Sequence, residues 1–241
     1  MNENPKLLNQ VRTQAQNRIG QKIYADAPES QKLLHQFGDQ VAQLCGCERI
    51  HGSIKSRERA HQKLADRLGG DWFEMRDTVR MTIIAPDMTR LRKVQATIRA
   101  RAVPHQKLGI IRDFELLPKQ SPCGYSGVNF AIRLQNGQAG EIQLNIPEVM
   151  YGQFAPDLFV SIVGQEASEK IRAAKGLDGG LGHAFYEIYR TGKSTPAGKQ
   201  AADLSTRYFE CLRSHSGAKA QTELVNAIAA FRSEHPKVFA H

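Results

Sequence analysis

The sequence predicts an α+β fold, in which strands in the middle of the chain are preceded and followed by helices. Three observations support this prediction. Residues 78–85 have the β-branched and aliphatic content of a buried strand, apolar and polar residues alternate over 128–134 and 142–146, and apolar residues recur at helical spacing near both ends. At 241 residues the chain is long enough for a full hydrophobic core, and we expect one domain over 1–241.

Two amphipathic helices are predicted in the first 45 residues. Apolar side chains recur there every three or four positions, at Leu7, Leu8, Val11, Ala15 and Ile19 and again at Leu33, Leu34, Phe37, Val41 and Leu44. We expect both helices to pack against the core.

A third helix is predicted after Ser53 or Ser56, either of which would be its N-cap. It should end at Leu68, because two glycines follow. Three cations fall four residues apart and would form one basic stripe on it, namely Lys55, Arg59 and Lys63. In most proteins such a stripe is a solvent-exposed helix face.

The strand at 78–85 is followed by a helix that Asp87 caps, with Leu91, Val94 and Ile98 on its inner face. After the alternating segments we expect an apolar stretch at 154–162 and a glycine-rich turn at 178–182. Further helices are predicted at about 183–190, 201–212 and 223–231.

The two alternating segments predict a β-hairpin that turns at Asn136-Gly137. A three-residue loop or a bulge near 137–140 would keep all apolar residues on one face, since a slip by one residue would bury Glu141 among them. The expected cross-strand pairs on the other face are Arg133 with Glu141, Ala131 with Gln143, and Asn129 with Asn145. One face would be core and the other a polar site, although Glu141 would also be explained as an exposed partner of Arg133.

The net charge of +9 and the isoelectric point near 9.5 favour a polyanionic partner such as a nucleotide, RNA or an acidic membrane, while a generally basic surface is the simpler alternative. Cys45-Gly46-Cys47 lacks the second half of a zinc site, so we expect reduced cysteines and a cytoplasmic protein. We expect neither a membrane span nor a cleaved secretory signal.

Four short motifs follow one another between residues 52 and 190. They are Ile54-Lys55-Ser56 before a basic helix; Arg76-Asp77-Thr78-Val79-Arg80 before a strand; Asp113-Phe114, Pro118-Lys119, Gly124-Tyr125 and Glu141-Ile142-Gln143 in one run; and GHAFYE, which holds His183 and Glu187. In order and spacing they resemble the synthetase domain of the RelA/SpoT alarmone synthetases, and most closely its toxin-like small branch.

This resemblance implies a mixed β-sheet flanked by helices, with a nucleotidyltransferase-like core at 52–190 and helical additions at 1–51 and 191–241. It also implies an ATP-dependent pyrophosphokinase, which moves the β,γ-pyrophosphate of ATP onto the ribose 3′-hydroxyl of a guanosine or adenosine nucleotide and releases AMP. Such a reaction needs carboxylates for Mg²⁺, cations for the triphosphate and groups that hold the acceptor base.

The resemblance also assigns roles. Asp77 and Glu141 would bind Mg²⁺, and Glu141 would accept the proton of the attacking hydroxyl. Phosphate charge would be offset by a basic and polar set made of Lys55, Ser56, Arg59, Arg80 and Lys119. The acceptor would be held by Tyr125, which would stack on the base, with Asn129, Gln143 and His183. Tyr125 as a turn aromatic and His183 as a capping or packing residue are the simpler alternatives.

Several positions depart from the family pattern. Ser53 stands where an arginine would help to sandwich adenine, so Arg57, Arg90 or Arg92 would have to replace it. The spacing of Asp77 and Arg80 is shorter than usual, which makes Glu74 the alternative metal ligand. Asn129 replaces a histidine, and an insertion at about 150–180 would form a lid or a binding surface for a larger acceptor.

The chain has no His-Asp dipeptide, so nothing in it resembles the hydrolase half of bifunctional members. An unopposed synthetase would be toxic, and we therefore expect an antitoxin, an immunity protein or delivery into the cytoplasm of another cell. Two alternatives remain: pyrophosphorylation of the tRNA 3′ end, and a catalytically inactive nucleotide- or RNA-binding module.

Overall fold

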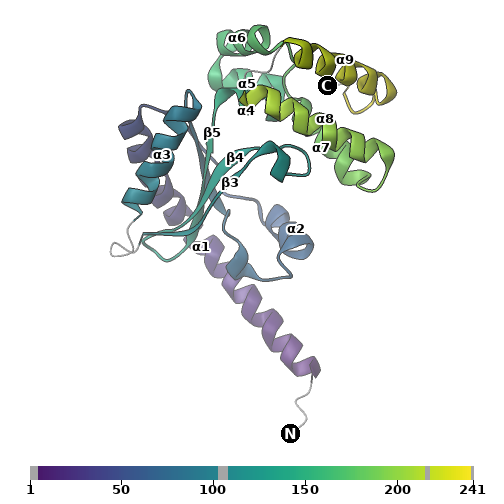
Figure 1. Cartoon of the computed structure of the whole chain (residues 1–241). Coiled ribbons are helices and arrows are strands. Elements are labelled where there is room, and N and C mark those ends of the chain that lie inside the picture. The colour runs from purple at the N-terminus through teal and green to yellow at the C-terminus, as the bar shows by residue number, and fades with distance from the viewer. Residues whose placement is uncertain (1–4, 103–107, 215–217, 240–241) are drawn as a thin grey trace. The chain divides into compact units, whose positions relative to one another are not determined.

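The computed structural model describes residues 5–102, 108–214 and 218–239 (Figure 1). By its internal contacts the chain divides into two compact units. The first unit comprises Met1–Phe114 with Asn129–Leu144, and the second comprises Glu115–Val128 with Asn145–His241. The expectation of a single domain stays a prediction.

A mixed five-stranded sheet is the framework for the site. Its strands are β1 (Glu48–His51), β2 (Val79–Ile84), β3 (Gly109–Leu116), β4 (Gly127–Arg133) and β5 (Ala139–Asn145), in the order β1-β2-β5-β4-β3. β1 is antiparallel to β2, with Arg49 opposite Ile83. The strand expected at 78–85 and both strands of the hairpin are confirmed, whereas β1 was not predicted.

The hairpin turns through a three-residue loop, as expected. The Leu134 N–H donates to the Gln138 carbonyl at 2.7 Å, the Gly137 N–H donates to the Leu134 carbonyl at 2.8 Å, and Gly137 has a φ of +85°. A ladder that continues regularly from this pair sets Ala131, rather than Arg133, opposite Glu141. The predicted register is therefore wrong by two residues. Because side chains alternate with a period of two, the assignment of faces is unchanged.

The two faces of the hairpin differ as predicted. Phe130, Ile132, Ile142 and Leu144 are at most 1% exposed and form the core, whereas Glu141 and Gln143 are half-buried on the opposite face. Arg133 is exposed. The polar face is the one that carries the candidate site.

Residues 5–45 form one helix, α1 (Pro5–Cys45), where the sequence predicted two. Pro28 lies inside it and costs one backbone hydrogen bond, roughly 3 kcal/mol in a free helix. Tertiary packing overrides this cost, because Leu34 and Val41 are fully buried beyond the proline. Three residues expected on the apolar faces are instead exposed: Val11 at 57%, Leu44 at 52%, and Ala15.

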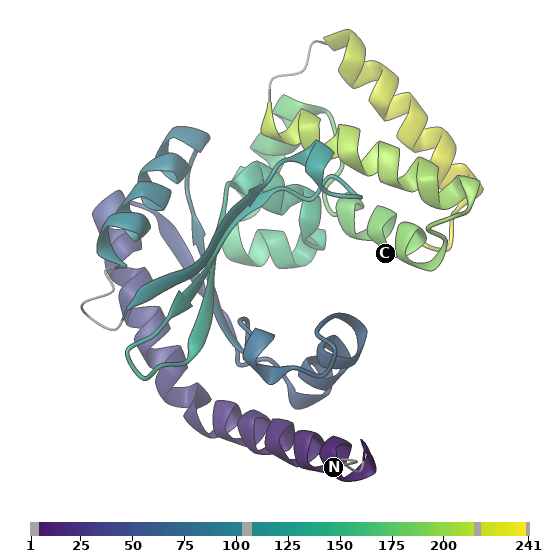
Figure 2. The same ribbon diagram turned by 60° about the horizontal axis from the view of Figure 1, so that its bottom comes forward.

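Helices cover both faces of the sheet in the first unit. Figure 2 shows α1 and α3 (Met88–Arg101) on one face and α2 (Arg57–Arg67) on the other. α3 begins as predicted, because the Asp87 side chain accepts from the Arg90 N–H at 2.7 Å. Its expected inner face, Leu91, Val94 and Ile98, is buried.

α2 is held by the first half of α1. Ser56 caps α2 as predicted, but the helix begins at Arg57, so Lys55 lies before it and not on it. A buried cluster joins α2 to the short helix η1 (Trp72–Glu74): Ala60, Leu64, Trp72 and Met75, with Ile19, Ile23 and Tyr24 of α1 packed against them. A Cβ at Gly20 would lie 2.5 Å from the Trp72 ring, so only glycine allows this contact.

The second unit consists of helices around an aromatic core. They are the short helix η3 (Pro118–Gln120), α4 (Pro147–Gln153), α5 (Pro156–Val163), α6 (Gln165–Lys175), α7 (Leu181–Thr191), α8 (Pro196–Arg213) and α9 (Ala218–Glu234). The last three confirm the predicted helices, each somewhat longer. The insertion at 150–180 lies mainly in α4, α5 and α6. No helix in the described ranges is long and apolar enough to cross a membrane.

Candidate active site

A nearly buried carboxylate lies between two lysines in the first unit. Lys55 Nζ is 3.0 Å from Asp77 Oδ2, and Lys63 Nζ is 2.8 Å from Asp77 Oδ1. The side chains of Lys55 and Asp77 are only 12% and 14% exposed. Burial alone would raise the pKa of Asp77, but the hydrogen bonds and charges of Lys63 and Lys55 outweigh it and hold this pKa below its ordinary value.

Three separate segments bring these groups together. Lys55 comes from the turn before α2, Lys63 from the body of α2, and Asp77 from the turn before β2. The Lys55 N–H donates to the Thr78 carbonyl at 2.9 Å, and the Tyr24 hydroxyl donates to the Lys55 carbonyl at 2.8 Å. The turn that carries Lys55 is thus fixed from both sides.

Glu141 projects from the polar face of β5 into the electrostatic environment of this cluster. Burial raises the pKa of its carboxyl, and the negative charge of Asp77 adds to the increase. The Gln143 amide, which donates to Glu141 Oε2 at 2.9 Å, and the two lysines act in the opposite direction without cancelling it. Glu141 therefore has an increased affinity for a proton, as a general base requires.

The donor set of this cluster fits Mg²⁺. Asp77 and Glu141 offer carboxylate oxygens, and Mg²⁺ is usually bound by one or two carboxylates together with water and substrate phosphates. No cluster of three or more His, Cys, Asp or Glu that could hold a metal occurs among the described residues. A divalent cation here would thus complete its coordination with oxygens from water or substrate.

The other predicted phosphate residues of the first unit lie around this cluster in different environments. The Ser56 hydroxyl accepts from the Arg59 N–H at 3.3 Å as the cap of α2, and the Arg59 side chain is exposed. Arg80 is half-buried on β2, with its carbonyl bound by the Gly52 N–H at 3.1 Å. Glu74, the alternative to Asp77, is instead paired with Arg76 at 2.6 Å.

Of the three candidates to replace the missing adenine-binding arginine, only Arg57 adjoins the phosphate residues. It follows Lys55 and Ser56 directly, and its guanidinium lies 4.6 Å from the centroid of the Tyr24 ring. Arg90 and Arg92 make other contacts, Arg90 to the Cys45 carbonyl at 2.6 Å and Arg92 to Gln95 at 3.1 Å.

In the second unit, the Gly124-Tyr125 motif lies directly on α8. Gly124 has a φ of +66°, and a Cβ there would collide with the backbone of Ser205 and Thr206. The Ser205 hydroxyl donates to the Cys123 carbonyl at 2.7 Å and fixes the same loop. The motif therefore requires glycine for both conformation and close approach.

Tyr125 and His183 line one cavity of about 400 Å³ in the second unit, as a shared acceptor role would require. We call this cavity the tyrosine pocket. Its lining includes Cys123, Tyr125, Gln153, His183, Tyr186 and Tyr189. Burial raises the pKa of Cys123 to about 11, so its thiol is neutral and unsuited to nucleophilic attack. Glu187 pairs with Arg190 at 2.6 Å.

The remaining predicted residues divide between the units. Asn129 belongs to the first unit, where it is buried on β4 and its Oδ1 has no hydrogen-bond partner among the described residues. Lys119 belongs to the second unit, where it is 80% exposed on η3 and lies 3.4 Å from Glu210.

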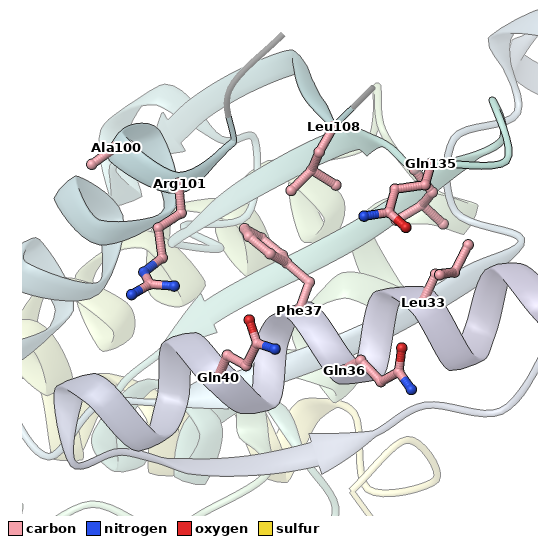
Figure 3. A pocket seen from close by; sticks show the side chains of 9 residues that line it. Leu33, Gln36, Phe37, Gln40, Ala100, Arg101, Leu108 and Gln135 are labelled. Carbon is pink, nitrogen blue, oxygen red and sulfur yellow. The ribbon is translucent and has the colours of Figure 1, made fainter. Parts of the chain in front are cut away.

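A different cavity, of about 310 Å³, lies in the first unit against α1 (Figure 3). Its lining includes Phe37, Gln40, Arg101, Leu108 and Gln135. Arg101 and Gln40 come from α3 and α1, the two helices that cover the sheet face opposite to α2. None of the predicted site residues lines it.

No known family model matches the chain. Over 198 residues, or 82% of the chain, the sequence is 31% identical to the (p)ppApp synthetase toxin Tas1 of Pseudomonas aeruginosa. The fold matches the crystal structure of the complex between the Type VI effector Tas1 and its immunity protein, with a TM-score of 0.70 and 30% identity over 80% of this chain and 95% of that one. The chain belongs to the Tas1 family of RelA/SpoT-type alarmone synthetases.

The alarmone synthetase fold is also seen in a more distant structure. A GTP pyrophosphokinase family protein from Streptococcus pneumoniae matches with a TM-score of 0.51 and 13% identity, over 80% of this chain and 88% of that one. The chain spans 43% of the length of the curated Tas1 protein. The predicted resemblance and the predicted fold class are confirmed.

Lys63 is the cluster residue that the sequence reasoning did not assign to an alarmone synthetase site. Its place in the stripe with Lys55 and Arg59 was the available signal, but such stripes are usually solvated. The structure brings Lys55 and Lys63 to Asp77 and leaves the intervening Arg59 exposed. Because Lys55 precedes the helix, the spacing of four does not place all three on one helix face.

Proposed function

We propose that the chain is an ATP-dependent pyrophosphokinase, which transfers the β,γ-pyrophosphate of ATP to the ribose 3′-hydroxyl of a purine nucleotide, releases AMP and acts as a growth-inhibiting toxin. The observation that supports this most strongly is the cluster of Lys55, Asp77 and Lys63 beside Glu141. It combines two lysines that can bind phosphate with two carboxylates, one of which, Glu141, has a raised pKa.

Lys55 and Lys63 would each have one role in the free protein and another when ATP is bound. In the free protein they neutralise a carboxylate whose burial would otherwise be costly. A triphosphate would offer them stronger partners, and Asp77 would then be released to bind a divalent cation. Asp77 and Glu141 would hold Mg²⁺, which would supply positive charge to offset the negative charge of the phosphates.

Glu141 would accept the proton of the attacking 3′-hydroxyl. Its raised pKa increases the driving force for that transfer, and the Gln143 amide holds the carboxylate in one orientation. Ser56, Arg59, Arg80 and Lys119 are proposed as further phosphate-binding groups that stabilise negative charge as it moves to the leaving AMP.

The tyrosine pocket would hold the acceptor. Tyr125 would stack on the purine, and His183 would lie on another wall of the same pocket. Asn129 and Gln143 are proposed to contact the ribose or its phosphates. Because the Tas1 relative is a (p)ppApp synthetase, an adenosine nucleotide is the favoured acceptor and a guanosine nucleotide the alternative.

A dedicated protein partner is part of the proposal. The related Tas1 is a Type VI effector that forms a complex with an immunity protein. We therefore expect an immunity protein for this chain and action in the cytoplasm of a target cell. The net charge of +9 also keeps the tRNA 3′ end as a second acceptor to test.

The test is a transfer assay with γ-³²P-ATP and Mg²⁺, in which AMP, ADP, GMP, GDP, GTP or total tRNA is added in separate reactions. We expect label in a small purine nucleotide together with an equal amount of AMP. If label appears only in tRNA, the acceptor is RNA and not a small nucleotide. If the protein binds ATP but transfers no label, it is a catalytically inactive nucleotide-binding module.

A further inference from the structure

A glutamine that lines the tyrosine pocket carries a buried amide oxygen with no hydrogen-bond partner among the described residues. Gln153 is the last residue of α4 and lines this pocket, and its Oε1 is buried with no hydrogen-bond partner among the described residues. Buried acceptors are nearly always satisfied in folded proteins, so an amide whose oxygen is unsatisfied, on a side chain that lines a cavity, is suited to pair with a donor on a ligand.

Two glycines fix the position of this amide. A Cβ at Gly152 would collide with Leu212 and lie 2.9 Å from Tyr208, and a Cβ at Gly182 would lie 2.8 Å from the Gly152 carbonyl. α4, α7 and α8 can therefore approach closely only because both positions are glycine. Gln153 and His183, the residues that follow the two glycines, both line the pocket.

The chemistry of the lining suits adenine better than guanine. A glutamine amide can accept from the adenine N6 amino group and donate to N7, whereas guanine presents two acceptors, O6 and N7, at the same edge. The described lining residues include no aspartate or glutamate that could accept from guanine N1 and N2. Tyr125, Tyr186 and Tyr189 provide aromatic surfaces on which either base can stack.

We infer that Gln153 reads the acceptor base and makes the tyrosine pocket selective for adenine nucleotides. This inference rests on the proposed function, because it assigns the tyrosine pocket to the acceptor. It names a specificity residue outside the four sequence motifs, on the helix that begins the insertion.

The first test measures base selectivity in the transfer reaction. The full chain is given labelled ATP with equimolar ADP and GDP, and the two products are separated. We expect wild-type protein to prefer ADP and Gln153→Leu to lose about tenfold or more of that preference, since one bidentate base contact discriminates by roughly this much. Gln153→Glu should shift the ratio toward GDP, because a carboxylate can accept from guanine N1 and N2. Gln200→Glu makes the same change on the exposed surface of α8 and should leave the ratio unchanged.

The second test separates this inference from the proposed function. The donor site is first saturated with α,β-methylene-ATP, which cannot transfer pyrophosphate. The binding of AMP and GMP is then compared for wild-type protein and Gln153→Glu. This variant has nearly the same shape as the wild type, and its melting temperature is checked beforehand. A loss of adenine preference in the variant supports the inference, even if wild-type protein transfers no label and the proposed function fails. An unchanged AMP-to-GMP ratio overturns it, even if transfer is observed.

Discussion

Lys63 Nζ lies 2.8 Å from Asp77 Oδ1, and this ion pair joins α2 to the turn before β2. Lys63 is 29% exposed and Asp77 is 14% exposed, so the pair is shielded more than a surface salt bridge but remains open to a ligand. Lys55 holds the other oxygen of the same carboxylate at 3.0 Å. The proposed cation site and the proposed phosphate site thereby share three side chains.

Replacing Lys63 should weaken ATP binding. Lys63→Met keeps the aliphatic stem but removes one charged donor to the phosphates, which we expect to raise the KM for ATP and lower kcat/KM by roughly ten- to a hundredfold. The steady-state rate at varied ATP checks this. Lys22→Met is the matched control, because Lys22 pairs with Asp26 while 73% exposed, and it should have no effect. Equal kinetics for the two variants would remove Lys63 from the site.

Removing the base at Glu141 should stop the reaction without releasing ATP. Glu141→Gln has nearly the same shape, and a loss of general-base catalysis is expected to lower the rate by about 10²–10⁴-fold. Single-turnover transfer and ATP binding are to be measured side by side. A variant that binds ATP normally and transfers at the wild-type rate would exclude Glu141 from proton transfer.

The dependence of kcat/KM on pH should reflect the raised pKa of Glu141 in the free protein. The base acts in its deprotonated form, so the rate should rise with pH, with its midpoint above the ordinary carboxyl value of 4.5. The same raised pKa favours the protonated folded state, so this group's contribution to stability should decrease as the pH rises through its folded pKa. Rate profiles from pH 4 upward test the first statement, and a midpoint at or below 4.5 would contradict it.

Tyr125 should affect the acceptor more than ATP. Tyr125→Ala removes a ring from the tyrosine pocket, and the loss of one stacking contact is expected to raise the acceptor KM by about tenfold. Tyr125→Phe keeps the ring and should restore most of the affinity. The two KM values are measured with the other substrate saturating, and equal losses for ATP and acceptor would argue against stacking.

The sequence predicted the hairpin and the helix after β2 because local rules determine both. Alternation fixed the faces of β4 and β5, and Asp87 fixed the start of α3. It failed at α1, where the two apolar patches were interpreted as separate helices. Pro28 is tolerated there because both halves of the helix are packed, which local sequence cannot reveal.

The sequence predicted those residues of the candidate site that lie within the four motifs. Lys55, Asp77 and Glu141 lie in motifs, and the structure brings their charges together. Lys63 could not be assigned to the site without knowing that α2 begins at Arg57. Gln153 has no sequence signal, since its importance comes from an unsatisfied oxygen beside a cavity formed by α4, α7 and the loop before Tyr125.

The most direct test of the central claim is ³¹P NMR of the complete reaction of ATP with the preferred purine nucleotide and Mg²⁺. The account predicts that AMP and a nucleotide bearing a diphosphate on its 3′-oxygen accumulate in equal amounts. Accumulation of ADP and inorganic phosphate, with no 3′-diphosphate, would show that the protein cleaves the terminal phosphate instead and would contradict the account.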